Sequence, residues 1–143
     1  MIACADTGFL VSLYGHDSQS AAATALVKSK PVFLLTLLGE AEFTNALQLQ
    51  VFRGQWTRRQ ARMIQDQFVQ HQALGIFRSE PLDPEVWTKA LLLSRRHSAK
   101  LGTRTLDVLH VAAALVLHPD VFYSFDERQR KLARAERLRV LPA

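Results

Sequence analysis

Short apolar runs alternate with longer stretches of helical periodicity along the chain. Apolar runs with the length of buried strands lie at residues 1–5, 32–35, 121–125 and 138–141, and a brief extended segment lies at residues 75–78. The intervening stretches predict a loop at residues 98–103 and helices at residues 9–14, 20–28, 37–52, 58–74, 84–96, 104–115 and 127–136. Strands that alternate with helices are typical of a parallel sheet with helices on both faces. The pattern therefore predicts an α/β fold.

The chain has the size of one domain. Its 143 residues, 48% of them hydrophobic, can bury a substantial core but are too few for two ordinary domains. No linker, internal repeat or low-complexity segment interrupts the pattern. We therefore expect residues 1–143 to form a single domain.

The charge and the cysteine content indicate the kind of partner and the cellular compartment to expect. Lys and Arg outnumber Asp and Glu by 18 to 13, which favours polyanionic partners such as nucleic acid, although a charge that only solubilises the surface is the alternative. Cys4 is the sole cysteine and lies in an apolar run, so we expect a small buried side chain in a reducing compartment. The first basic residue is Lys28, and no apolar run approaches about 20 residues. We therefore expect a soluble cytoplasmic protein without a signal peptide or a membrane span.

The most apolar helix, residues 104–115, begins with an acid. Thr103 or Thr105 is positioned to cap its first turn, and Asp107 lies near the positive end of the helix dipole. Because this helix is apolar on every side, we expect it to be buried and its acid to point into a crevice. The alternative is an acid that only stabilises the start of its helix.

Other acids are positioned to reach the same crevice. Asp6 and Asp126 follow strands, and the carboxyl ends of parallel strands meet at one edge of a sheet. Glu40 and Glu42 lie about 200° apart on their helix, so only one of them can face the crevice, and periodicity leaves the choice open.

Carboxylates crowded into one crevice repel each other. Either their pKa values rise or they bind a divalent cation. Hard oxygen donors select Mg²⁺ or Mn²⁺, and the chain lacks the Cys and His spacing of a zinc site. An acidic metal site on a basic protein is suited to phosphodiester hydrolysis, in which the metal activates water and basic side chains hold the phosphates.

Several neighbouring side chains are candidates for supporting roles. Four basic residues that precede Asp107 are candidates for phosphate binding, with Arg104 the best placed, although such residues are more often solvated surface charges: Arg95, Arg96, Lys100 and Arg104. His110 shares a helix face with Asp107 and is either a ligand or positioning donor, or an ordinary core histidine. Ser124 shares a strand face with Asp126, so its hydroxyl is a candidate for holding metal-bound water, the alternative being an ordinary strand serine.

Four motifs occur in a characteristic order: ADTGFL at 5–10, EFTNAL at 42–47, RTLDVLHVAAA at 104–114 and SFDERQ at 124–129. Together they resemble the PIN-domain ribonucleases and, within them, the VapC-type toxins of bacterial toxin–antitoxin pairs. The resemblance covers essentially the whole chain and favours Glu42 over Glu40, because Asn45 follows Glu42 at the family spacing.

The resemblance implies a three-layer α/β/α sandwich with a short parallel sheet. It also implies a Mg²⁺- or Mn²⁺-dependent endoribonuclease that forms a homodimer and whose cleft is blocked by an antitoxin. Its catalytic metal ligands are then Asp6, Glu42, Asp107 and Asp126, supported by Thr7, Asn45, Ser124 and His110. Many members carry Ser or Asn where this chain has Gly8, so a hydroxyl near the metal has to come from Thr7 or Ser124.

Other functions share parts of this pattern. Asp6-Thr7-Gly8 also matches the active-site triplet of aspartic proteases, but that fold is all-β with glycine-rich flaps, whereas this chain is largely helical and has only 6 glycines. The remaining alternatives on the same fold are an RNA-processing nuclease without an antitoxin and a non-catalytic module that binds RNA or a protein.

Overall fold

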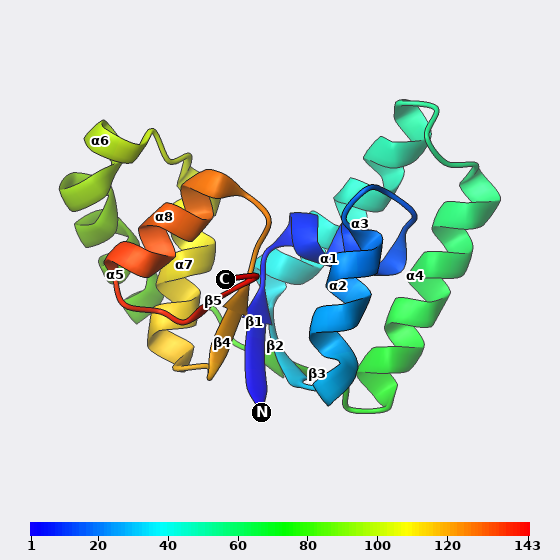
Figure 1. Cartoon of the computed structure of the whole chain (residues 1–143), viewed down its shortest axis with the longest axis horizontal. Coiled ribbons are helices and arrows are strands. Elements are labelled where there is room, and N and C mark those ends of the chain that lie inside the picture. The colour runs from blue at the N-terminus through cyan, green and yellow to red at the C-terminus, as the bar shows by residue number, and fades with distance from the viewer.

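Five parallel strands form a central sheet in the order β3-β2-β1-β4-β5 (Figure 1). In this computed structural model, which describes residues 1–143, the strands are β1 (Ile2–Ala5), β2 (Val32–Thr36), β3 (Phe77–Glu80), β4 (Val121–Tyr123) and β5 (Val140–Leu141). In the central strand, Ala3 pairs with Phe33 of β2 and with Val121 of β4. Because every pairing is parallel, the carboxyl ends of all five strands lie along one edge of the sheet.

Helices cover both faces of this sheet (Figure 1). One layer contains α1 (Thr7–Tyr14), α2 (Ser20–Leu26), α3 (Leu37–Phe52) and α4 (Arg58–Ala73), and the other contains α5 (Pro84–Leu93), α6 (Ala99–Leu101), α7 (Thr105–Leu117) and α8 (Glu127–Ala135). A 3₁₀ turn (Val27–Ser29) follows α2, and a π-helical turn (Ser94–Ser98) follows α5. The predicted three-layer α/β/α sandwich with a short parallel sheet is confirmed.

The segment after α5 differs from the prediction. Residues 98–103 were expected to form a loop, but the chain stays helical through Leu101, because the π-helical turn leads directly into α6. The helix ends at Gly102, whose φ of 64° lies in the left-handed region that favours glycine. The strand predicted near residue 75 begins two residues later, at Phe77.

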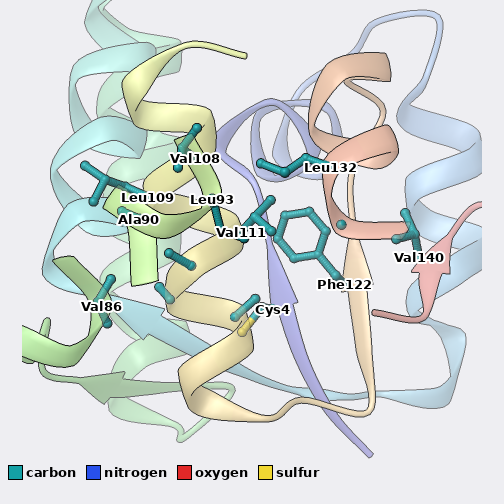
Figure 2. Close-up of a cluster of buried hydrophobic side chains, with 14 of the residues drawn as sticks. Cys4, Val86, Ala90, Leu93, Val108, Leu109, Val111, Phe122, Leu132 and Val140 are labelled. Carbon is teal, nitrogen blue, oxygen red and sulfur yellow. The ribbon is translucent and has the colours of Figure 1, made fainter. Parts of the chain in front are cut away.

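The sheet separates two hydrophobic cores. Successive strand residues point to opposite faces, so Ala3 packs with α1–α4 whereas Cys4 packs with α5, α7 and α8. Figure 2 shows the second core, in which Cys4 and Phe122 of the sheet meet Val111 of α7 and Leu132 of α8. Cys4 is a free, buried cysteine, as its apolar surroundings predicted.

The burial predicted for α7 is confirmed, because residues 108–114 are all buried. The predicted threonine cap is wrong. Arg104 occupies the N-cap position, and the Asp107 carboxylate accepts a hydrogen bond from its backbone N–H at 3.2 Å, while Thr103 hydrogen-bonds to Ser98 at 2.8 Å. The Asp107 side chain, three residues after the N-cap, thus supplies an acceptor for the backbone N–H of the N-cap residue. None of the helices combines the length and the apolar character needed to cross a membrane.

Candidate active site

Asp6 lies where β1 turns into α1. It is the N-cap of α1, and its Oδ1 accepts a hydrogen bond from the backbone N–H of Phe9 at 2.6 Å. Its Oδ2 accepts a hydrogen bond from the Ser124 hydroxyl. The side chain is 1% exposed, and this burial raises the pKa of Asp6 to about 6, against the lowering effect of both hydrogen bonds and of nearby His110. The nearby charge of Asp126 raises the pKa further.

Ser124 connects Asp6 to Asp126. Besides donating to Asp6, its Oγ accepts a hydrogen bond from the backbone N–H of Asp126 at 3.0 Å. Asp126 is the N-cap of α8 and accepts a hydrogen bond from the backbone N–H of Gln129 at 2.8 Å. Arg130 donates to the Ser124 carbonyl at 3.1 Å and so holds this turn in place. The two acids at the strand ends are therefore linked through a single serine.

Gln129 connects Asp126 to Asp107. Its backbone N–H binds Asp126, while its side-chain Nε2 donates to the Asp107 carboxylate at 3.1 Å. The side-chain oxygen of Gln129 is buried and has no hydrogen-bond partner. Sequence reasoning assigned no role to Gln129, although its place three residues after a capping acid was the available signal.

Glu42 of α3 meets residues from two other helices. Its Oε2 accepts a hydrogen bond from the Thr7 hydroxyl at 3.1 Å and pairs with Nε2 of His110, which lies one turn after Asp107 on α7. Burial alone raises the pKa of Glu42, but the hydrogen bond and charge of His110, together with the Thr7 hydroxyl, outweigh it and lower the pKa below its ordinary value. The structure thus brings Glu42, rather than Glu40, to these partners.

The acids form two neighbouring hydrogen-bonded sets instead of a preformed cage. No three His, Cys, Asp or Glu side chains are arranged so that they could hold a metal ion. Asp6 and Asp126 share Ser124, Asp126 and Asp107 share Gln129, and Glu42 is joined to Thr7 directly beside Asp6. Apart from His110 and the Arg130 guanidinium, the groups hydrogen-bonded within these sets are oxygen and amide groups.

The basic residues predicted to bind phosphate differ in their distance from the acids and in their partners. Arg104 and Lys100 are exposed, on the segment that leads into Asp107. Arg96 pairs with Glu136 at 3.0 Å, at the opposite end of α8 from Asp126. Arg96 is therefore occupied by an ion pair away from the acids.

The remaining predicted neighbours fall outside the hydrogen-bonded network. Arg95 is exposed on the π-helical turn, and Asn45 is exposed on α3, one turn after Glu42. A separate groove of about 1220 Å³ lies between α1, α2 and α4, where the Tyr14 hydroxyl meets Nδ1 of His71 at 2.5 Å. Half of its 20 lining residues are hydrophobic.

Several solved structures share this fold. Solved structures with the same fold include the sarcin-ricin loop cleaving toxin VapC20 of Mycobacterium tuberculosis, with a TM-score of 0.68 and 20% identity over 90% of this chain and 93% of that one. FitAcB of Neisseria gonorrhoeae has a TM-score of 0.70 and 16% identity over 98% and 96% of the two chains.

A third structure, VapBC2 of Rickettsia felis bound to a promoter DNA fragment, has a TM-score of 0.66 and 15% identity over 98% of this chain and 97% of that one. No curated protein sequence matches the chain. The sequence profile of the PIN domain family matches residues 3–135, which is nearly the whole chain. The order of the strands, the acids at their carboxyl edge and this match agree, and the chain belongs to the PIN domain family.

Proposed function

We propose that this protein is a metal-dependent endoribonuclease that hydrolyses RNA phosphodiester bonds as the toxin of a toxin–antitoxin pair. The observation that carries the proposal is that four separate segments bring acids to one edge of a PIN-domain sheet. Ser124 and Gln129 link Asp6, Asp126 and Asp107 by hydrogen bonds, and Thr7, the residue after Asp6, binds Glu42. The likeness to VapC20, a toxin that cleaves the sarcin-ricin loop, supports RNA as the substrate class.

The residues present fit a divalent metal ion in their chemistry. The four acids supply hard oxygen ligands, the donor type of Mg²⁺ and Mn²⁺. Asp6 is buried with a pKa of about 6, so its ionised form near neutral pH is stabilised by an added cation. The unpartnered side-chain oxygen of Gln129 lies beside Asp107. We infer that these four acids hold Mg²⁺ or Mn²⁺, which when bound supplies positive charge to a phosphodiester and to attacking water.

The surrounding side chains orient the acids. The Ser124 hydroxyl binds one oxygen of Asp6, and the Thr7 hydroxyl binds one oxygen of Glu42. These two residues therefore supply hydroxyl groups at the acids, which Gly8 cannot do. His110 keeps Glu42 ionised, because its hydrogen bond and charge lower the pKa of that acid. These contacts restrict the carboxylates to a few orientations before RNA arrives.

The exposed basic residues beside the acids are suited to the phosphates. Arg104 and Lys100 flank the entry to α7, within the same segment of chain as Asp107. A guanidinium group binds phosphate oxygens in a bidentate manner, which favours Arg104 as the stronger contact. Together they place positive charge next to an acidic site that would otherwise repel RNA.

The direct test is cleavage of total RNA by the purified protein with Mn²⁺, with Mg²⁺ or with excess chelator. We expect fragments with either metal and none with chelator. Equal cleavage with metal and with chelator contradicts metal dependence, and binding of RNA without cleavage over a broad panel identifies a non-catalytic module.

We further propose a protein partner and a second copy. An antitoxin is expected because the similar structures include VapBC2 and FitAcB, and the groove between α1, α2 and α4 is a partly apolar surface large enough for a peptide segment. Trp87 and Leu91 lie one turn apart on α5 and are 50% and 59% exposed, an apolar face suited to a homodimer contact.

Two measurements test these partners. Light scattering should give a dimer mass that the Trp87→Glu, Leu91→Glu double variant reduces to that of a monomer. Co-purification with the product of an adjoining small gene, with loss of cleavage in the complex, separates a toxin from an RNA-processing nuclease that needs no antitoxin. Both proposals assign the protein to the cytoplasm, where RNA and an antitoxin would be met.

A further inference from the structure

A basic and aromatic surface lies at the far end of α3 and the start of α4. We call it the α3–α4 tip and define it by five exposed side chains: Phe52, Arg53, Arg58, Arg59 and Arg62. Figure 1 shows that α3 extends past the carboxyl edge of the sheet before the chain turns into α4. The tip therefore projects on the same side of the molecule as the acids.

The arginines of the tip are not explained by the stability of their helix. Three of the first five residues of α4 are arginines, and its first turn contains no acid. Cations at a helix N-terminus oppose the helix dipole, so this placement is mildly destabilising. None of the three takes part in an ion pair within the chain, and the helix start is already secured by a capping box between Thr57 and Gln60.

An exposed aromatic ring accompanies these charges. The Phe52 side chain is 87% exposed, and it borders a cavity of about 550 Å³ between α3 and α4. Arg58 and Arg62 line the same cavity, and Asp66 is its one acid. Exposed aromatic rings interleaved with arginines are suited to stacking on unpaired bases while the phosphates are held.

The turn that carries the tip is anchored to the body of the protein. Trp56 packs so closely against Gly15, at the end of α1, that a Cβ on Gly15 would lie 2.6 Å from the indole Cζ2. The tip therefore keeps a defined position relative to the acidic site.

Phe52 also lies on the same side of α3 as Glu42. Asn45, Leu49 and Phe52 follow Glu42 at steps of three, four and three residues, and so lie along one side of α3. Ten residues of helix span about 15 Å, the length of roughly four to five stacked nucleotides at about 3.4 Å each.

We propose that the α3–α4 tip is a second RNA-binding site, which holds single-stranded RNA four to five nucleotides from the bond that is cleaved. The arginines bind its phosphates and Phe52 stacks on a base. This inference rests on the proposed function in taking RNA as the ligand. The cluster of cations beside an exposed ring favours RNA over a protein partner.

The test measures binding of a fluorescent 12-nucleotide single-stranded RNA to the full-length protein in excess chelator, as a function of salt. The paired variant Arg58→Gln, Arg62→Gln is compared with Arg134→Gln, Arg139→Gln, which removes the same charge from exposed positions on α8 and immediately before β5. We expect the tip variant alone to lose affinity and its salt slope to fall by about 1.4, the value for two phosphate contacts on a single strand. Phe52→Ala should weaken binding by about tenfold with the slope unchanged.

A length series separates this inference from the proposed function. With metal present, the tip variant should cleave trinucleotides as the wild type does and show a raised KM only for substrates long enough to reach the tip. Equal affinity and equal slope for the tip and control variants overturn the second site even if the wild type cleaves RNA. Loss of binding to a partner protein without any loss of RNA binding overturns it as well. Tip-dependent RNA binding by a wild type that fails to cleave supports the second site and contradicts only the nuclease.

Discussion

The acidic site and the α3–α4 tip carry opposite charges and are built in opposite ways. At the site, each carboxylate is held by a neighbouring side chain or a helix amide, as Asp6 is by Ser124 and Asp107 is by Gln129. At the tip, Arg58 and Arg62 are exposed and form no ion pair. Asp6 is buried and its pKa is raised, and the pKa of Glu42 is lowered, whereas the side chains of the tip are exposed to solvent.

The difference teaches which property each region requires. Groups that act on a reacting atom must be held within a fraction of an ångström, and hydrogen-bonded neighbours do this. Groups that attract a polyanion of varied sequence need only charge in the right place, because phosphate contacts carry no sequence information. The predictions below change one region at a time, in order from the largest expected effect to the smallest.

The largest effect is expected at Asp107. Asp107→Asn removes the charge of one proposed metal ligand and should lower RNA cleavage about a thousandfold or more, the scale seen when a group essential to transition-state stabilisation is lost. The measurement is the initial rate with saturating Mn²⁺. Glu85→Gln, at an exposed acid in the first turn of α5, is the matched control and should retain full activity. Activity within tenfold of the wild type would show that Asp107 is not a metal ligand.

The second prediction concerns stability and pH. Asp6 has a pKa of about 6 in the folded protein and 3.8 when unperturbed, so the folded state binds the proton more tightly. The contribution of Asp6 to stability is therefore greatest below pH 4 and is lost as the pH rises through about 6. Asp6→Asn keeps a capping side chain but cannot ionise, and should be more stable than the wild type at pH 7.5 by up to about 3 kcal/mol.

Urea unfolding of both proteins from pH 4 to pH 8, in excess chelator, measures this difference. Subtracting the two curves removes the contribution of every other titrating group. A difference that does not change with pH would mean that burial does not raise the pKa of Asp6. Added Mg²⁺ should reverse the order, because it stabilises only the protein that binds it.

The third prediction concerns Ser124. Ser124→Ala removes the hydrogen bond that lowers the pKa of Asp6, so this pKa should rise above about 6 and the acid limb of the pH–rate profile should move to higher pH. If Asp6 is a metal ligand as proposed, the rate should fall about 10- to 100-fold, the usual effect of removing a residue that orients a ligand. Ser79→Ala, at an exposed serine of β3, serves as the control. A lower rate with an unmoved profile would assign Ser124 a merely structural role.

The smallest effect is expected at the tip, where the substitutions should raise the stability of the protein. Arg58→Glu and Arg59→Glu each place an acid in the first turn of α4, which should stabilise the protein by about 0.3–1 kcal/mol while RNA affinity falls. Arg134→Glu, in the last turn of α8, should destabilise it by a similar amount. Thermal unfolding at low salt measures both. A loss of stability at Arg58 would show that the arginine supports the fold.

Much of the fold could be predicted because its signals are local. The apolar run at residues 1–5 followed by Asp6 became β1 and its helix cap, and the continuous apolar character of residues 108–114 required a buried helix. The ends of the elements depend on other contacts. The π-helical turn after Leu93 and the self-capping of α7 by Asp107 depend on which backbone groups find partners, and the periodicity of side chains does not record this.

The choice between Glu40 and Glu42 shows the limit for the site. Both lie on the same helix, and only the position of α7 decides that Glu42 meets His110. The role of Gln129, and the pairing of Arg96 with Glu136 away from the acids, likewise depend on how α8 packs. Contacts between residues far apart in the chain depend on how whole helices pack, and no short stretch of sequence specifies that packing.

By itself, the sequence determined the α/β class, the parallel order of strands and helices, the buried helix α7 and the acids available for chemistry. These depend on hydrophobic periodicity and chain direction, which act over a few residues. Tertiary structure alone decided that Ser124 links Asp6 to Asp126, that His110 holds Glu42, and that the α3–α4 tip projects past the carboxyl edge of the sheet. Burial and hydrogen bonding between distant segments exist only once the layers have packed, so the pKa values and geometry of the site arise at that stage.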